Sequence, residues 1–334
     1  MKFLYIIAIS ALALTACSKK QEVSSPAFSV TAVKNNGNTV ASFAPGDTVN
    51  FKFTGNPNVI TFYSGEVGKR YQYATRTQAA GTAQLQFSSQ LANGTQANSL
   101  SLLVSSDFKG IALKTLAGVS VRDTTTTNAN IAAATWTDIT SRATLAASIG
   151  VAVPSGVIDL SDFAKQGKPV YIAFKYNAVA ATIQNKWTIT NLAINNVLSD
   201  GTSYTIANLN SPLKPLANYG NISYSPGWAV SFDPAKNTNN YAWTYADGTS
   251  LVITGASTAG AATASAEAWA ITGPVDLSKV TPDVGVAIKS IIATLSAYSY
   301  SYSQAGNYNA IFVATNITAT DSKTIVQQVP VTVK

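Results

Sequence analysis

The stretch AYSYSYSQAGNYNAIFVATN, residues 297–316, decides the fold. Tyr298, Tyr300 and Tyr302 alternate with serines, and a turn at Gly306 leads into an apolar strand. A strand has a period of two, so the three tyrosines share one face. That face is either an aromatic surface that binds a ligand or the inner wall of a β-domain. In both cases the stretch predicts strands that cannot bury a core alone.

The strands predicted at the other end of the chain are also too few to bury a core alone. The segments FSVTAV, GDTVNFKFTG and NVITFYSGE predict three strands, and GDTVNFKFTG places Val49, Phe51 and Phe53 on one face. The closing TIVQQVPVTVK adds one more strand. Because neither group suffices for a sandwich, we expect the two ends of the chain to complete each other.

The middle of the chain carries enough strands for a sandwich of its own. AQLQFSS, NSLSLLVSSDFKG, AATWTDIT, GVIDLSDF, KPVYIAFKY, KWTITNLAINNV, YAWTYADG, SLVITG and AEAWAITG follow one another with turn-rich spacers. DVGVAIKSIIATL fits either a helix or a strand. We therefore predict an all-β protein with an inserted jelly-roll domain at 81–280, and a discontinuous sandwich made of 27–80 plus 281–334.

Composition limits the chemistry. The 334 residues include no histidine and one cysteine, Cys17, which excludes histidine triads, histidine-ligated zinc, disulfides and thiol catalysis. The net charge is +7, but Lys and Arg are scattered, so we expect no nucleic-acid partner. Carboxylates, hydroxyls and aromatic rings remain. They suit calcium, carbohydrate or protein recognition, or a two-carboxylate glycosidase.

The amino terminus predicts export. The apolar run from Phe3 to Leu14 is too short to span a membrane and is typical of a signal peptide, residues 1–16. Leu14-Thr15-Ala16-Cys17 resembles a bacterial lipobox, which implies lipidation of Cys17. Residues 17–26 then form a flexible tether. By similarity to known lipoproteins, Ser18 indicates sorting to the outer membrane.

Two segments are candidate ligand sites. In NNYAWTYADG, Tyr241, Trp243 and Tyr245 share a strand face that either stacks on sugar rings, assisted by Asn240 and Asp247, or packs into the core.

The segment FYSGEVGKRYQYATR is the second candidate. It is either a ligand cleft or a structural hinge in which Glu66 pairs with Arg70. Its candidate binding residues are Tyr63, Glu66, Arg70, Tyr71 and Tyr73.

The remaining residues give weaker signals. Trp136, Trp187, Trp228 and Trp269 lie in apolar contexts that predict core positions. A structural calcium ion is compatible with the scattered aspartates, but no linear motif supports it, and we expect no cofactor. Nothing among the 15 acidic residues singles out a catalytic pair.

The segments FAPGDTVNFKFTG, YSYSYSQAGNYNAIFVATN and VPVTV resemble strands of immunoglobulin-like domains of the polycystic-kidney-disease (PKD) type. Together with SLLVSSDFKG, SGVIDLSDF and AEAWAITGPVDLSKVTPDVGV, they resemble a family of Bacteroidota surface lipoproteins with a domain of unknown function. That resemblance implies inward positions for Tyr302 and Tyr308, which favours the wall interpretation of the tyrosines. It also implies a place near glycan-uptake loci of the starch-utilisation type.

The hypothesis from these observations is a non-catalytic, lipid-anchored protein on the cell surface that captures polysaccharide or oligosaccharide. The resemblance implies a TonB-dependent transporter and its lipoprotein partner as neighbours, with membrane attachment through lipid alone. The alternative is a structural or adhesive lipoprotein that contacts other proteins. A glycoside hydrolase is the third and least supported reading.

Overall fold

The computed structural model describes residues 22–34, 36–209, 227–246 and 249–334. The chain divides into two compact units: unit 1 takes the chain up to Thr75 and again from Pro282 to Lys334, and unit 2 is Arg76–Thr281. The sequence predicts these borders at 80/81 and 280/281. The signal segment, Cys17 and Asp247 lie outside the described residues.

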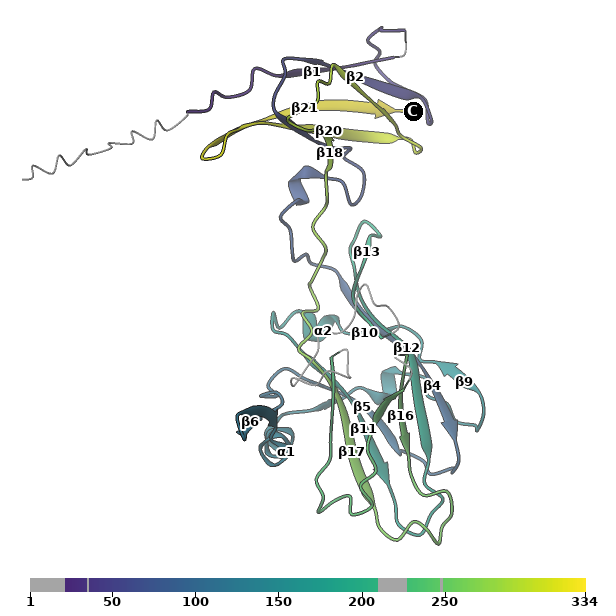
Figure 1. The fold of residues 1–334 in the computed structure, drawn as a ribbon. Coiled ribbons are helices and arrows are strands. Elements are labelled where there is room, and N and C mark those ends of the chain that lie inside the picture. The colour runs from purple at the N-terminus through teal and green to yellow at the C-terminus, as the bar shows by residue number, and fades with distance from the viewer. Residues whose placement is uncertain (1–21, 35, 210–226, 247–248) are drawn as a thin grey trace, which may run out of the picture. The chain divides into compact units, whose positions relative to one another are not determined.

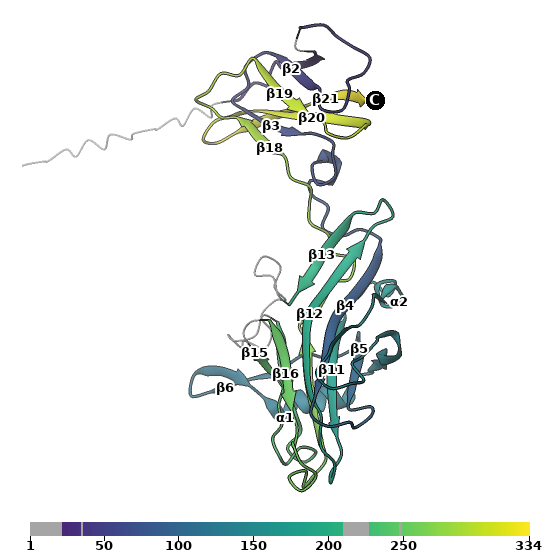
Figure 2. The ribbon, with the colours of Figure 1, turned by 90° about the vertical axis from the view of Figure 1, so that its right-hand side faces the viewer.

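Unit 1 consists of two antiparallel sheets drawn from both ends of the chain, seen as purple and yellow strands side by side in Figures 1 and 2. The first sheet has the order β1-β2-β19. The second has the order β18-β3-β20-β21. The strands are β1 (Ser29–Val33), β2 (Thr48–Thr54), β3 (Val59–Tyr63), β18 (Val286–Lys289), β19 (Ala297–Ser301), β20 (Gly306–Ile317) and β21 (Ser322–Val333), with a 3-10 turn η1 (Tyr71–Tyr73).

The core of unit 1 is aromatic and comes from both ends. Phe312 of β20 lies 4.9 Å from both Phe51 and Phe62, and 5.4 Å from Phe53, measured between ring centroids. Val49 and Phe51 are fully buried in the same cluster as Phe312 and Val331. The early and late strands therefore share one core.

The tyrosines of β19 belong to this wall. Tyr302, directly after β19, is 1 % exposed and stacks on Tyr308 with ring centroids 4.3 Å apart. Tyr298 and Tyr300 are half-buried and contact Phe62 at 5.0 and 5.1 Å. The wall interpretation of the opening stretch is confirmed.

Unit 2 is a second sandwich. One sheet has the order β10-β4-β12-β16-β15, with β13 added to β12 and β9 added to β4, and the other has the order β14-β17-β11-β5-β8. The first contains β4 (Thr82–Ala92), β9 (Ala152–Pro154), β10 (Ile158–Asp159), β12 (Lys186–Val197), β13 (Ser203–Asn208), β15 (Thr244–Ala246) and β16 (Ser250–Thr254). The second contains β5 (Leu100–Ser105), β8 (Thr137–Asp138), β11 (Tyr171–Ala178), β14 (Trp228–Ser231) and β17 (Ala266–Thr272).

The long strands of unit 2 alternate between its sheets. The chain crosses from one sheet to the other between β4 and β5, between β11 and β12, and between β16 and β17. Such crossings are typical of the jelly-roll type of sandwich. The inner faces meet in one large apolar core that includes Phe87, Phe174, Trp187 and Trp228. The predicted all-β class with two sandwiches is confirmed.

Several local predictions were wrong. Within and beside the predicted strand AATWTDIT, the chain forms helix α1 (Thr124–Ala133) and the short β8. The predicted strand GVIDLSDF is β10 followed by α2 (Ser161–Ala164), and a ribbon of β6 (Leu113–Leu116) and β7 (Val119–Arg122) was not anticipated. The ambiguous DVGVAIKSIIATL forms strand β18, and Ile292 beyond it is 97 % exposed.

The tether is shorter than predicted. The backbone N–H of Val23 donates to Asp321 Oδ2 at 3.4 Å, and Asn316 Nδ2 donates to the carbonyl of Ser24 at 3.0 Å. Pro26 is buried. Gly55 has a φ of +89° and passes so close to Ala27 that a Cβ would lie 1.7 Å from its carbonyl oxygen. Residues from Val23 onward therefore belong to unit 1 and not to a free linker.

We expect Phe312→Ala to lower the free energy of unfolding of unit 1 by about 3–5 kcal/mol, because it empties the centre of the shared aromatic core. Urea denaturation, followed separately by tyrosine and tryptophan fluorescence, measures the loss. All five tryptophans lie in unit 2, so their transition stays in place.

The matched control is Val326→Ala on β21, whose side chain is 43 % exposed. It should change stability by no more than about 0.5 kcal/mol. Equal effects of the two substitutions would contradict the shared core.

Candidate functional site

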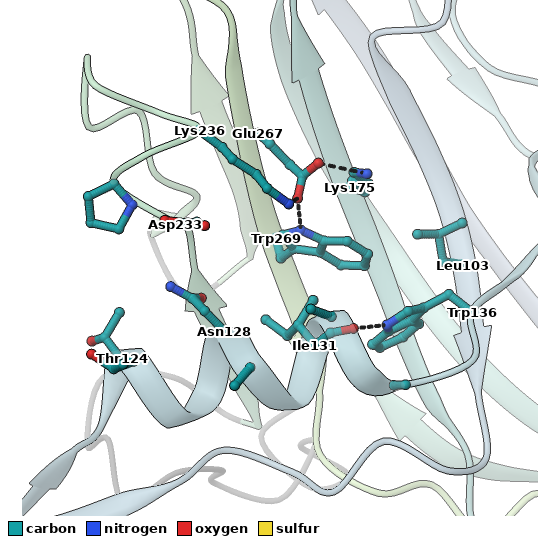
Figure 3. Close-up of a pocket in the computed structure, with 15 residues that line it drawn as sticks. Leu103, Thr124, Asn128, Ile131, Trp136, Lys175, Asp233, Lys236, Glu267 and Trp269 are labelled. Atoms are coloured by element: carbon teal, nitrogen blue, oxygen red, sulfur yellow. Dashed lines mark hydrogen bonds and ion pairs between the residues drawn. The ribbon is translucent and has the colours of Figure 1, made fainter.

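A cavity of about 740 Å³ opens on the outer face of the sheet β14-β17-β11-β5, where α1 lies across it (Figure 3). This volume is within the usual range for small-ligand sites. The lining combines two indole rings, two lysines, two carboxylates, hydroxyls and an amide. The residues are Leu103, Thr124, Thr125, Asn128, Ala129, Ile131, Ala132, Ala134, Trp136, Lys175, Asp233, Pro234, Lys236, Glu267 and Trp269.

The floor of the cavity follows from strand alternation. In β17, Glu267 and Trp269 point to the outer face, while Ala268 and Ala270 point to the core. Trp269 is directly opposite Lys175 of β11 in the ladder. Opposed residues on one face are within contact distance. The Lys175 ammonium accordingly lies 5.1 Å from the centre of the Trp269 ring.

Helix α1 forms one wall. Its sequence TTTTNANIAA is rich in β-branched residues and has low helix propensity, so side chains at its ends and contacts with the sheet must hold it. Asp123 caps the first turn by accepting from the backbone N–H and the hydroxyl of Thr126, at 3.3 and 2.8 Å. Ile131 is 6 % exposed and packs against the sheet.

Trp136 closes the far end of this wall. Its indole N–H donates to the carbonyl of Ile131 at 3.0 Å, which satisfies one of the free carbonyls at the end of α1. Its ring lies 5.1 Å from Trp269 and 5.5 Å from Phe108. Trp136 is half-buried, whereas Trp269 is 6 % exposed. Trp136 therefore presents more of its ring to a ligand.

Asn128 joins the helix to β14. Its Nδ2 donates to the carbonyl of Phe232 at 2.8 Å, and its Oδ1 accepts from the Ser231 hydroxyl at 2.7 Å. These bonds hold the polar end of the cavity, where Thr124 and Asp233 lie beside Asn128 (Figure 3). The cavity thus has a polar end and an aromatic end.

Glu267 connects the charged groups. Its Oε2 lies 2.8 Å from Lys175 Nζ, and its Oε1 lies 3.9 Å from Lys236 Nζ. Oε1 also accepts from the Trp269 indole N–H at 3.0 Å. Burial opposes ionisation of this carboxyl, but the hydrogen bonds from Lys175 and Trp269 outweigh it and lower its pKa. Glu267 is consequently ionised at neutral pH and fixes the Trp269 ring.

The first predicted site does not form an aromatic platform. Trp243 is 1 % exposed and donates to the carbonyl of Ala268 at 3.3 Å, so it is a core residue. Tyr241 and Tyr245 are half-buried and pack against the same core, and the Tyr245 hydroxyl donates to Leu209. Asn240 lies at an exposed turn with a φ of +57°. This result corresponds to the packing alternative for these rings.

The second predicted segment is a structural clasp in unit 1. Arg70 pairs with buried Asp283 at 3.0 Å, so the predicted Glu66–Arg70 pair is wrong. Glu66 instead accepts from the hydroxyls of Ser64 and Tyr300.

The tyrosines of this clasp complete it. Tyr63 and Tyr71 contact edge to face at 5.3 Å, and the Arg70 guanidinium lies 4.6 Å from the Tyr73 ring. These contacts are packing interactions within unit 1.

The sequence reasoning missed the cavity residues. It assigned Trp136 and Trp269 to the core, and it did not consider Lys175, Lys236 or Asp233. The signal that could have found the cavity is the alternation in AEAWAITG. It puts Glu267 and Trp269 on one face of the strand and alanines on the other face. The clustering of Trp136 with Trp269 depends on α1, whose threonine-rich sequence gives no helical signal.

Other kinds of site are not indicated. Within the ranges that the structure describes, no group of three or more His, Cys, Asp or Glu side chains is placed to hold a metal ion. Over the same ranges, no helix has the length and apolar character needed to cross a bilayer.

Comparison with known families gives one match. The model of a domain of unknown function, DUF5017, matches residues 16–212, which is more than half of the chain. The chain belongs to the DUF5017 family. The match runs from Ala16, through the first strands of unit 1, to the region after β13 in unit 2. Comparisons with curated proteins and with solved structures gave no match.

We expect Glu267→Gln to destabilise unit 2 of this DUF5017 protein by about 1–2 kcal/mol at pH 7, because hydrogen bonds to a charged acceptor are lost. The pKa of Glu267 is lowered by folding from 4.5. Its contribution is therefore complete above that value and disappears as the pH falls through the folded-state pKa. The difference in melting temperature between wild type and E267Q should shrink from pH 7 to pH 3.

Tryptophan fluorescence during thermal melting measures this difference. Other carboxyls with lowered pKa values, such as Asp159 and Asp276, are shared by both proteins and cancel in the comparison. A difference that stays constant with pH would contradict the ionised state of Glu267.

Proposed function

We propose that this DUF5017 protein is a lipid-anchored, non-catalytic carbohydrate-binding protein, and that its binding site is the cavity between α1 and β17. The observation that carries the proposal is the pairing of a half-buried indole with fixed polar groups in one cavity. Sugars present C–H faces that pack on aromatic rings, and hydroxyls that bond to carboxylates, amides and ammonium groups. An oligosaccharide therefore matches both ends of the cavity.

The site is pre-organised for such a ligand. Glu267 holds Trp269 and Lys175, and Asn128 holds α1 against β14. Binding then orders few additional side chains, which lowers its entropic cost. The two lysines and two carboxylates of the lining balance in formal charge. This balance favours a neutral glycan over a strongly anionic one.

The electrostatics favour binding over hydrolysis. A glycosidase needs one carboxylic acid with a raised pKa to protonate the leaving group. The pKa of Glu267 is lowered, and its oxygens already accept hydrogen bonds from Lys175 and Trp269. The chain has no histidine to take that role.

The lipid anchor is supported by the sequence around Cys17. The lipobox-like Leu14-Thr15-Ala16-Cys17 follows an apolar run, and the family match begins at Ala16, next to the cysteine. Acyl chains on this residue would hold the protein on a membrane, since each buried methylene contributes about 0.8 kcal/mol. We propose the outer membrane and its surface as the location, with a glycan importer of the TonB-dependent type and its lipoprotein as partners.

A structural or adhesive role is the second candidate. The β6-β7 ribbon exposes Leu116 and Val119 by 64 % and 62 % at its turn. Exposed apolar side chains on a two-stranded ribbon are typical of protein contacts. Under this function, Leu116→Ser would release a co-purifying protein, whereas substitutions in the cavity would have no effect.

We expect the protein without its signal segment to be retarded in native gels that contain a polysaccharide it recognises. Trp136→Ala should weaken that binding about tenfold or more, because loss of a central aromatic contact costs upward of about 1 kcal/mol. Lys236→Ala, with a 57 % exposed side chain, tests the same cavity without disturbing the core. The measurement is affinity electrophoresis over a panel of polysaccharides.

Tyr71→Ala is the matched control, because Tyr71 is an exposed aromatic residue of the other candidate segment. It should leave retardation unchanged. Loss of binding in this variant alone would move the site to unit 1. No retardation on any glycan, or release of reducing sugar by the pure protein, would contradict the proposal.

A further inference from the structure

The first described residues of the chain are fixed at one particular end of unit 1. The carbonyl of Ser24 accepts from Asn316, and the N–H of Val23 donates to Asp321. Asn316 also accepts from the backbone N–H of Asn58, whose side chain in turn accepts from the N–H of Ile317 at 2.8 Å. The chain entry, the start of β3 and the β20-β21 turn thus form one hydrogen-bonded end.

The chain leaves unit 1 from the other end. β3 begins at Val59, opposite Thr315, and ends at Tyr63, opposite Ile311. After Tyr63 the chain continues through the clasp to Thr75, and it returns at Pro282. The returning strand β18 places Val286 opposite Phe62 and Lys289 opposite Ile60. Both crossings therefore lie beyond the Tyr63 end of β3, away from Asn58.

The clasp keeps the two crossings together at that end. Arg70 donates to Asp283 from its backbone N–H and from Nε, at 2.9 and 3.0 Å. The N–H of Asp283 donates to the carbonyl of Tyr73 at 3.1 Å. The N–H of Val284 donates to the carbonyl of Gly68 at 2.9 Å. The entry and exit ends are separated by β3, which has five residues and is about 17 Å long.

We infer that unit 1 is oriented at the membrane, with its Asn316–Asp321 end facing the bilayer surface and its Tyr63 end, beyond which the chain continues into unit 2, facing away from that surface. This inference rests on the lipid anchor in the proposed function, but not on glycan binding. Val23 is six residues after Cys17, so an extended chain places the Asn316–Asp321 end within about 20 Å of the lipidated cysteine. Unit 1 is then held at the membrane by a short link.

The exposed side chains at this end fit a lipid headgroup region. Ile317 is 43 % exposed, and Lys323 is an exposed cation at the start of β21. Lys19 and Lys20 are two and three residues after Cys17 in the sequence. Lysines close to a membrane surface are attracted to its anionic lipids.

Site-specific quenching in vesicles tests the orientation. The full acylated chain is labelled with a fluorophore at Thr320→Cys in the β20-β21 turn, or at Val67→Cys, an exposed position of the clasp. Each labelled protein is reconstituted in vesicles of phosphatidylethanolamine and phosphatidylglycerol with spin-labelled headgroups. We expect quenching to be about threefold stronger at position 320, because the length of β3 separates the two positions.

A lengthened tether is the control. Insertion of about ten Gly and Ser residues after Ser18 should reduce the difference between the positions, because the link no longer limits the distance. Equal quenching without the insertion, or stronger quenching at position 67, would overturn the orientation alone. Failure of the intact protein to float with vesicles would overturn both the anchor and this inference. Loss of glycan binding alone would not contradict the inferred orientation of unit 1.

Discussion

Burial of Phe312 between Phe51, Phe53 and Phe62 is the contact on which the architecture depends. It joins side chains about 250 residues apart in the sequence, and neither end of the chain has a core without it. Closing so long a loop costs more entropy than closing a short one, although the cost grows only slowly with length. Unit 2 forms its own core, so the segment between the two ends of unit 1 is a compact insertion and not a flexible loop. The entropy cost of bringing the two ends together is therefore that of closing the compact insertion. Both crossings between the units, and the clasp that binds them together, are consequences of this one core.

The cavity of unit 2 depends on the way in which the outer face of its sheet is covered. A jelly-roll sheet normally has a solvated outer face, but here Trp269 and Ile271 make that face apolar and require a cover. Helix α1 and Trp136 supply the cover, and they leave a hollow where the small residues Ala129 and Ala132 of the helix do not fill the space. The ion pairs of Glu267 on its floor keep that hollow polar. Unpaired carboxylates or lysines at this depth would be costly, and the mutual pairing removes the cost.

Period-two patterns made the architecture predictable from the sequence. Val49, Phe51 and Phe53 predicted a buried face of β2, and Tyr302 follows β19, the neighbour of β2 in the same sheet, and packs into the same core. Contacts that depend on loops were not predictable in the same way. The partner of Arg70 is Asp283, more than 200 residues later in the chain, and only the pairing of β18 with β3 brings it close. The prediction of the ligand site failed for a related reason. The pattern of Tyr241, Trp243 and Tyr245 is typical of a face that stacks on sugars, but an aromatic strand face is as readily a core face. Trp136 and Trp269 become neighbours through a helix that its own sequence does not favour.

The insertion of unit 2 into unit 1 has a consequence for biosynthesis. Strands β1, β2 and β3 emerge from the ribosome before residues 76–281 follow, and their partners begin only at Pro282. At about 5–20 residues per second, translation of that insertion delays completion of unit 1 by roughly ten to forty seconds. During this interval Val49 and Phe51 have no native partner from β20, so these early strands are targets for holding chaperones. The polar residues Asn50 and Lys52 alternate with the apolar residues of β2, and polar residues at such positions oppose aggregation of an exposed strand.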